Sequence, residues 1–458
     1  MSGLLDSLSA ATNALSADTT GLNITGDNLA NINTVGYTRR TLNLAETPSA
    51  GLDSTGTGVT VVNVTAQRDQ FVEARIQSAR PGLAQATAVS TALSGVETSL
   101  GTPGASLDAT VSSLFDAFSS LSQDPTSTSN RDVVVSRAQA VAQGFAGMAS
   151  SLSDAQQQAD AAIKSAVNQV NGLSAQIATL NGQIATNGGS DVSALVDQRT
   201  VDANQLADLI GATVTTNNDG SVSLTAGNGQ PLVIGAAAFT LTMGTAPTTG
   251  FTTIQSQGVD QTSQFTAGQI GGLLHVRDTL VPSYQGQLDQ LAYDLATSVN
   301  AIHSTGVGAN GSTNQDLFTQ PATVAGAAQN MAVAPAVLAN SDLVAASATG
   351  TAGDNQTASA LAALRNQSLG PSGSSAADAW SQLVYQVGAD AADANNSQTT
   401  QQQIVDQLGQ MRDATSGVSS DEEAANLMMY QRAYEASARY FVTVNETLDA
   451  LMAMLATT

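Results

Sequence analysis

The chain has 458 residues and a formal net charge of −23, because 37 Asp and Glu outnumber 14 Lys and Arg. It lacks the cationic face that phosphate binding needs, so we expect no nucleic-acid partner. The absence of cysteine excludes disulfides and thiolate metal sites. No stretch approaches the ~20 apolar residues of a membrane span, so no membrane insertion is expected. Aromatic residues at 4% and charged residues at 11% favour long packed helices over a compact enzyme.

The first 32 residues predict an amphipathic helix. Positions on one stripe recur at alternating spacings of three and four, with two polar interruptions: Leu8, Ala11, Leu15, Asp18, Leu22, Thr25, Leu29 and Ile32. Gly21 and Gly26 each cost such a helix ~1 kcal/mol relative to Ala, so alone it is marginal. The segment also lacks the basic start and apolar run of a cleavable signal peptide, so we expect any export to use another route.

A turn follows in "NITGDNLANINTVGYTRR", residues 23–40. Asn31 can bond its own backbone in an Asx turn, and Gly36 offers the positive φ of a sharp exit from the helix. Tyr37 then stands as a rigid aromatic anchor beside Arg39 and Arg40.

The middle of the chain alternates between helical and strand patterns. A helical seam runs from Ile163 to Ile184. From Thr213 the period changes to two around Asn218-Asp219-Gly220, a hairpin signal, and Phe239–Met243 and Phe251–Ile254 resemble further strands. Helical periodicity returns after residue 270, so the β region is an insertion between helical segments.

The strongest periodic signal lies near the C-terminus. It keeps the three-and-four spacing throughout, over Leu427, Tyr430, Tyr434, Ser437, Phe441, Val444, Leu448, Leu451 and Leu455. At ~1.5 Å rise per residue this seam is roughly 40 Å long. The loop DATSGVSSDEE is expected to isolate it, with Ser420 as the cap of an acidic first turn. A lone amphipathic helix cannot bury its stripe, so the two terminal helices should pack against each other, against copies of themselves, or both.

These patterns predict a mainly α fold with an inserted β domain. The molecule should be elongated, with a long helical bundle and terminal coiled-coil helices that pair the N- and C-termini. We expect a terminal assembly domain at 1–60 plus 415–458, a helical bundle at 61–210 plus 271–414, and a small β domain at 211–270.

No residue pattern indicates catalysis, a cofactor or a metal. His275 and His303 are 28 residues apart without paired ligands, and are interpreted as polar surface or capping histidines. Asp421, Glu422 and Glu423 are neighbours that point apart on a helix, so stabilisation of the helix dipole explains them better than an acid–base pair.

Two end motifs carry a resemblance. "LNITGDNLANINTVGYTRR" resembles the N-terminal motif of rod, hook and hook-associated proteins of the bacterial flagellum, whose pattern is met at Ala30, Asn31, Thr34, Gly36, Tyr37 and Arg39. "SGVSSDEEAANLMMYQRAYEASARYF", residues 416–441, closely resembles the C-terminal motif of the hook-associated protein 1 family. Stretches beginning at Ala194, Gly271 and Gly353 agree in order, so the resemblance spans nearly the whole chain. The insertion after residue 211 is short for the family, and Arg40 adds a cation beyond the motif.

The resemblance implies a structural subunit, not an enzyme. Copies would form a ring with the third hook-associated protein at the junction between hook and filament, in contact with the hook protein. It also implies extracellular assembly on the flagellum after type III export without a cleaved signal, and an export chaperone that holds the C-terminal helix. The Tyr430, Tyr434 and Phe441 stripe suits capture in a groove.

Two other classes stay open on the sequence alone. An exported adhesin would explain the composition and the β insertion but not the matched heptads at both ends. A hydrolase of cell-wall polymers would need carboxylates that converge in a pocket, and no spacing singles out such a pair.

Overall fold

The computed structural model describes residues 2–47, 58–101, 107–187, 192–227, 229–370 and 373–456. The chain divides into two compact units. Unit 1 comprises Met1–Gly82, Gln169–Thr240 and Gln401–Thr458, and unit 2 comprises Leu83–Asn168 and Leu241–Thr400. The three-domain division expected from the sequence stays a prediction.

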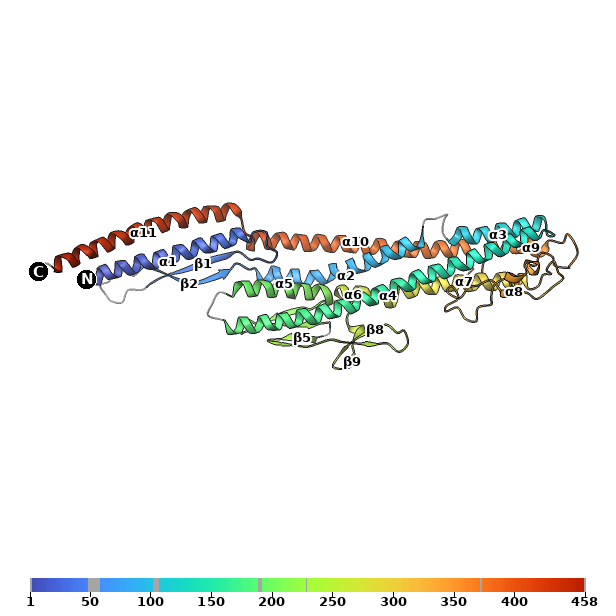
Figure 1. Ribbon diagram of the computed structural model, residues 1–458, viewed down its shortest axis with the longest axis horizontal. Helices are drawn as coiled ribbons and strands as arrows, with labels where there is room; N and C mark the ends of the chain where they lie inside the picture. Colours follow the sequence, from blue (N-terminus) through green and yellow to red (C-terminus); the bar gives the residue numbers. More distant parts are fainter. Residues whose placement is uncertain are drawn as a thin grey trace. The chain divides into compact units, whose positions relative to one another are not determined.

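Helices dominate the described residues, so the predicted mainly α fold with small β sheets is confirmed (Figure 1). The α-helices are α1 (Ser2–Ala30), α2 (Gln70–Leu100), α3 (Leu107–Gln123), α4 (Thr128–Thr186), α5 (Ser193–Ile210), α6 (Gly268–His275), α7 (Val281–His303), α8 (Pro335–Ala339), α9 (Gln356–Ala363), α10 (Ala376–Ser416) and α11 (Ser420–Ala456). A π-helix, η2 (Val276–Leu280), joins α6 to α7, and 3-10 turns η1 (Thr262–Gln264), η3 (Ser341–Leu343) and η4 (Leu364–Asn366) lie between other elements.

The strands form three antiparallel sheets. β1 (Arg40–Glu46) pairs with β2 (Val59–Ala66); β3 (Thr213–Thr216), β4 (Val222–Ala226), β5 (Gln230–Ile234) and β6 (Ala237–Ala238) form a second sheet; and β7 (Thr242–Thr245), β8 (Thr252–Ser256) and β9 (Val259–Asp260) form a third. The predicted hairpin is confirmed, with Thr213 opposite Thr225 and Gly220 at φ +79° in the turn. The predicted strand at Phe239–Met243 is only partly correct, because Phe239, Thr240 and Leu241 lie between β6 and β7.

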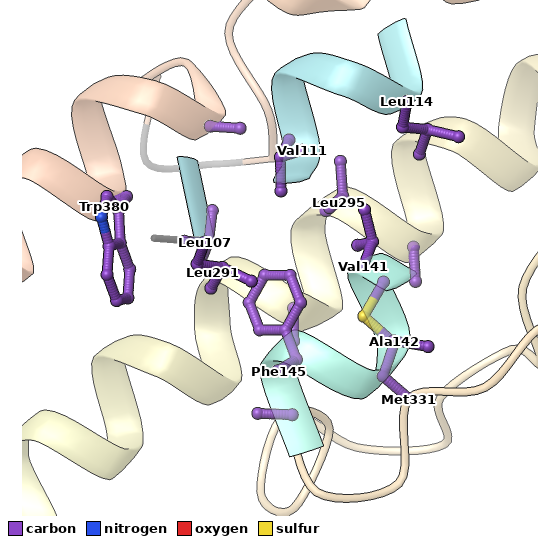
Figure 2. Packing of buried hydrophobic residues seen from close by; sticks show 14 of the residues in the cluster. Leu107, Val111, Leu114, Val141, Ala142, Phe145, Leu291, Leu295, Met331 and Trp380 are labelled. Carbon is purple, nitrogen blue, oxygen red and sulfur yellow. The ribbon is translucent and has the colours of Figure 1, made fainter. Parts of the chain in front are cut away.

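A continuous apolar core holds unit 2 together. Figure 2 shows Leu107, Val111 and Leu114 of α3 facing Val141 and Phe145 of α4 and Leu291 and Leu295 of α7. Leu114, Phe145 and Leu295 are 0% exposed. The Trp380 ring of α10 and Met331 of a connecting loop close the edges of this core.

A buried ion pair attaches the three-stranded sheet to the helices of unit 2. Asp160 of α4 accepts hydrogen bonds from Arg277 Nη1 at 2.7 Å, Thr252 N at 2.8 Å and Thr252 Oγ1 at 3.0 Å. Burial alone raises the pKa of Asp160, but bonds from Lys164, Thr252 and Arg277 outweigh it and hold the pKa below its ordinary value. Thr252, the first residue of β8 after the 246–251 connection, is therefore held by a buried carboxylate and not only by apolar packing.

Two local expectations are wrong. The connection before α11 is only residues 417–419, because α10 continues to Ser416 and α11 starts at Ser420. Its cap is Ser419, whose Oγ accepts from Glu422 N at 3.5 Å, so Ser420 is already inside the helix. His303 is not at the surface: it is 0% exposed, its Nε2 accepts from Ala345 N at 3.0 Å, and its Nδ1 lies 2.6 Å from Gln315 O.

Candidate assembly site

Helices α1 and α11 lie side by side and run antiparallel within unit 1, so the pairing of the two ends of the chain is confirmed (Figure 1). Residues near the start of α1 lie beside residues near the end of α11. Ser437 Oγ donates to Asp18 Oδ2 at 2.9 Å, so polar interruptions of the two stripes meet each other. A Cβ atom added at Gly21 would lie 2.5 Å from Tyr430 Cε1, because the tyrosine ring packs directly on this glycine.

The predicted seam residues lie along this contact but are covered unevenly. Leu8, Leu15 and Leu22 are half-buried, whereas Leu29 is 41% exposed. On α11, Val444 is buried and Tyr434 is 42% exposed; Leu427, Tyr430, Phe441, Leu448 and Leu451 are half-buried. Leu455 belongs to α11, and its side chain lies outside the described part. One antiparallel partner therefore covers the seam only in part.

A second heptad stripe on α11 is largely exposed to solvent, with Ala433 half-buried. We call it the outer stripe of α11: Met429, Ala433, Ala436, Tyr440, Thr443, Thr447, Ala450 and Met454. Met429, Tyr440 and Met454 are 54, 48 and 70% exposed. Thr443 Oγ1 and Thr447 Oγ1 donate to carbonyls of their own helix, so both methyl groups remain available for packing. The stripe contains no charged residue.

Helix α1 has an equivalent exposed face, the outer stripe of α1: Leu5, Ser9, Thr12, Ser16, Thr19, Asn23, Gly26 and Ala30. All eight are exposed, none is charged, and all but Leu5 and Asn23 are small. Thr12 and Thr19 donate to the carbonyls of Leu8 and Leu15, so their hydroxyls need no external partner. Small side chains allow another helix to approach closely.

The chain leaves α1 through a tight turn that matches the N-terminal motif. Asn31 Oδ1 accepts from Thr34 Oγ1 at 3.1 Å, and Tyr37 N donates to Thr34 O. Gly36 has φ +84°, as the sequence predicts, and a Cβ there would lie 2.3 Å from Val201 Cγ2 on α5. A side chain at this position would thus strain the backbone and collide with α5.

Asn28 is the centre of the polar contacts that join the turn to α11. It is 1% exposed, and its Nδ2 donates to Glu423 Oε2 at 3.1 Å and to Arg40 O at 2.9 Å. Its Oδ1 accepts from Tyr37 Oη at 2.8 Å and from Arg40 N at 3.0 Å. All four hydrogen-bonding positions of the buried amide are therefore used.

Arg39 completes the link to the C-terminal motif. Its Nε donates to Glu423 Oε1 at 2.8 Å, its Nη1 lies 2.7 Å from Glu422 Oε2, and its backbone N–H donates to Ser416 O. Glu423 is 2% exposed and so depends on these partners. Burial raises the pKa of Tyr37 to about 12, so the phenol stays protonated and donates to Asn28. The two end motifs thus form one bonded cluster.

The next residues tie this cluster to α5. Asp197 accepts from Thr38 Oγ1 at 2.8 Å and from Arg68, and Arg40 Nη2 lies 3.8 Å from it. Burial raises the pKa of Asp197, and Arg68 and Thr38 oppose that rise. The Arg40 guanidinium also lies over the Tyr37 ring, 5.2 Å from its centroid. Arg40, the cation beyond the family motif, therefore contacts both the motif and the body of unit 1.

The residue patterns do not single out Asn28, Thr38, Arg68 or Asp197, and they give Glu423 only a role in stabilising the helix dipole. Asn28 belongs neither to the seam positions of α1 nor to the motif positions that begin at Ala30, and its partner Glu423 is 395 positions away in the chain. The sequence signal was the adjacency of acidic residues to the C-terminal seam, which was interpreted only as dipole stabilisation. In the described part of the chain no group of His, Asp and Glu could hold a metal ion, and no helix is long and apolar enough to cross a membrane.

Comparison with protein families identifies three matching models. The flagellar hook-associated protein FlgK helical domain matches residues 93–318. The C-terminal model of flagellar basal body rod FlgEFG proteins matches residues 410–454, and the flagella basal body rod protein model matches residues 8–38. The two terminal matches coincide with the α1–α11 pair and the cluster at its base.

Curated relatives cover the whole length of the chain. Flagellar hook-associated protein 1 of Escherichia coli K12 is 26% identical over 99% of this chain and 100% of its own length. The Bacillus subtilis protein of the same name is 28% identical over 97% of each. Among solved structures, the flagellar hook junction protein FlgK from Burkholderia pseudomallei is similar in fold, with a TM-score of 0.66 at 18% identity over 74% of this chain and all of that one.

Proposed function

Because the chain belongs to the flagellar hook-associated protein 1 family, a family of structural flagellar proteins, we propose that it is the subunit of a ring that joins hook to filament. In this proposal copies of the chain associate through the α1–α11 pair. The hook protein contacts the ring on one side and the third hook-associated protein on the other. The cluster of Asn28, Arg39 and Glu423 holds the helix pair in a fixed register while neighbours are added.

The observation that carries the proposal is the exposure of the two outer stripes. Each stripe keeps a heptad period, which is the pattern of helix–helix packing and not of a solvated face. The face of α11 on the other side of the seam from the outer stripe, by contrast, carries the charged residues Glu435 and Asp449. The α11 stripe carries Met429, Tyr440 and Met454 among alanines and threonines, whereas the α1 stripe is small except for Leu5 and Asn23, so one copy's α11 can pack on the next copy's α1. Two different surfaces in contact give a head-to-tail array, which closes into a ring when the rotation permits.

Export and capture before assembly would involve the seam side of α11 and not its outer stripe. A chain that leaves the cell unfolded through the flagellar type III apparatus would form the α1–α11 pair only outside. Until then the C-terminal stripe of Tyr430, Tyr434 and Phe441 is free for an export chaperone to hold in a groove. The motif residues Asn31, Thr34, Gly36, Tyr37 and Arg39 would then order on assembly.

The test places one carboxylate on each side of α11. Tyr440→Glu on the outer stripe should abolish incorporation into flagella and swimming in a strain that lacks its own hook-associated protein 1. Met428→Glu is the matched control, since Met428 is 54% exposed on the same helix but lies on the face with Glu435 and Asp449. It should swim normally.

Circular dichroism of both purified variants should show unchanged helix content and unfolding, because neither side chain is buried. Normal swimming of the Tyr440→Glu strain, with the variant present at wild-type level in its flagella, would refute assembly through the outer stripe.

A further inference from the structure

A cavity with both polar and apolar walls lies in unit 1, away from the outer stripes. Its volume is about 310 Å³, and its walls come from the start of α2, one face of α5, and strands β3 and β4. Arg68, Arg199, Glu73, Thr200 and Thr216 supply polar groups to it, and Val196, Val214, Val222 and Ala203 supply apolar ones. The cavity is thus lined by two guanidinium groups in a chain of net charge −23.

Arg199 is buried without an ion pair to a carboxylate among the described residues, although the charge of Asp219 opposes the lowering of its pKa. It is 6% exposed, and its Nη1 donates to Asn181 Oδ1 at 2.9 Å and to Gly220 O at 2.8 Å. Its Nε and Nη2 have no hydrogen-bond acceptor among the described residues, and no carboxylate there forms an ion pair with it. A buried guanidinium is normally paired with a carboxylate and has hydrogen-bond acceptors for its nitrogens.

The other buried arginines of the chain differ from Arg199. Arg277 binds the carboxylates of Asp160 and Asp278. Arg131 has no carboxylate partner, but its Nε, Nη1 and Nη2 donate to the carbonyls of Val344, Ser127 and Pro125, so all three nitrogens are used. Arg199 alone of these three combines an unmatched charge with unused donors beside a cavity.

A second cation in the cavity makes the buried charge of Arg199 less favourable unless an anion binds beside it. Arg68 lines the same cavity and its charge, after burial, further lowers the pKa of Arg199. Arg68 is itself neutralised by Asp197 and donates to Thr200 Oγ1 at 3.0 Å, so Asp197 is not available to Arg199. Glu73 also lines the cavity, but burial raises its pKa, and the cation that opposes this rise most is Arg412.

The geometry points to a carboxylate-binding site at Arg199, in which the guanidinium fork binds the carboxylate and the valines enclose a short alkyl stem. A planar guanidinium with two free nitrogens matches a carboxylate bidentately. The carboxylate has two sources: a free dicarboxylate, or an Asp or Glu side chain of a second copy. The second source rests on the ring proposed above, whereas the first does not.

Succinate is the probe for the full-length monomer. Thermal unfolding is followed in sodium succinate and in sodium chloride of equal ionic strength. Wild type should unfold several degrees higher in succinate, because a ligand that binds only the folded state stabilises it. Arg199→Gln should lose this shift, while Arg131→Gln, which removes a buried arginine elsewhere, should keep it. Equal shifts in both salts for wild type would overturn the inference.

A second variant keeps the test decisive if Arg199→Gln does not fold. Thr216 is exposed and lines the cavity, so Thr216→Glu should place a carboxylate within it, raise the unfolding temperature in chloride and abolish the response to succinate. Thr215→Glu, also exposed on β3 but outside the lining, should do neither. If Thr216→Glu behaves like Thr215→Glu and responds fully to succinate, the site is not there.

The two sources are separated by self-association. If the natural ligand is an acidic side chain of a second copy, succinate and Arg199→Gln should both reduce assembly measured by light scattering, relative to chloride. If it is a free carboxylate, assembly stays unchanged while the thermal shift remains. Failure of assembly in Tyr440→Glu alone, with an intact succinate shift, affects the ring proposal and not this site.

Discussion

The core of unit 2 and the α1–α11 pair of unit 1 are both made of helices, but they are held in different ways. In unit 2, side chains such as Leu114, Phe145 and Leu295 are wholly buried among three or more elements. In the pair, most seam residues are half-buried, and specific bonds such as Asn28–Glu423 and Ser437–Asp18 fix the register. A core that needs no partner buries its apolar surface, whereas a surface kept for partners relies on polar contacts to stay aligned.

The largest effect should come from the core. Phe145→Ala removes a fully buried ring from unit 2 and should cost ~3–5 kcal/mol through lost burial and the cavity left behind. Leu448→Ala in the pair removes a half-buried side chain and should cost only about 1 kcal/mol. Hydrogen exchange measured by mass spectrometry should show faster exchange across α3, α4 and α7 in the first variant and only in α11 in the second. Equal costs would mean that the pair is packed as tightly as the core.

The second largest effect on stability should come from loss of the buried Glu423 carboxylate. Glu423→Ala leaves Asn28 Nδ2 and Arg39 Nε without that acceptor in a buried place, which should destabilise the helix pair by about 2 kcal/mol. Glu422→Ala is the control, because that side chain is 62% exposed and its ion pair is worth well under 1 kcal/mol. Protection of the α1 and α11 amides from hydrogen exchange measures the destabilisation in both variants. Similar losses of protection in Glu423→Ala and Glu422→Ala would contradict a special role for Glu423.

Two glycines of α1, Gly21 and Gly26, should respond in opposite ways to replacement by alanine. Gly21→Ala should destabilise the pair by about 1 kcal/mol, since the added Cβ displaces the Tyr430 ring and this outweighs the gain in helix propensity. In Gly26→Ala nothing lies within 4 Å of the new Cβ, so the same gain of up to ~1 kcal/mol should appear as added stability. Opposite signs in thermal unfolding are expected. A stabilised Gly21→Ala protein would show that Tyr430 moves away freely.

The smallest effect is a pH dependence confined to unit 2. Burial lowers the pKa of His303, so the folded state keeps the imidazole neutral while the unfolded chain takes up a proton near pH 6.5. This group's contribution is therefore fully present above that pH and is lost on acidification, by up to ~1 kcal/mol on going from pH 7.5 to pH 6. Denaturant unfolding of wild type and His303→Gln between pH 7.5 and 6 measures it. A parallel loss in both proteins would assign the effect to other groups.

Much of the fold can be predicted from the spacing of apolar residues along the chain. The three-and-four spacing of Leu427 to Leu451 places these residues on the covered side of α11, and the change to period two after Thr213 marks the strands. The pairing of the two ends was also predictable, because each stripe needs cover. The roles assigned to the motif and seam residues stay predictions, which the assembly variants above address.

The polar cluster was not predictable in the same way. Asn28, Thr38 and Asp197 find partners 395 and 159 positions away, and no spacing rule reaches across such distances. His303 was misplaced for a related reason, because its acceptor role towards Ala345 arises only when a loop 42 positions away folds over it. Polar residues at ordinary surface-like positions become buried when tertiary contacts supply exact partners.

The antiparallel pairing also fixes an order of events during synthesis. Asp18 is made early, but its partner Ser437 is added 419 positions later, and Asn28 waits almost as long for Glu423. Helix α1 therefore emerges from the ribosome with its apolar stripe unmatched for nearly the entire time of translation. Helix α1 contacts β1 and β2, which follow it directly in the chain, but its main partner α11 is made last, so a product truncated before α11 lacks that cover.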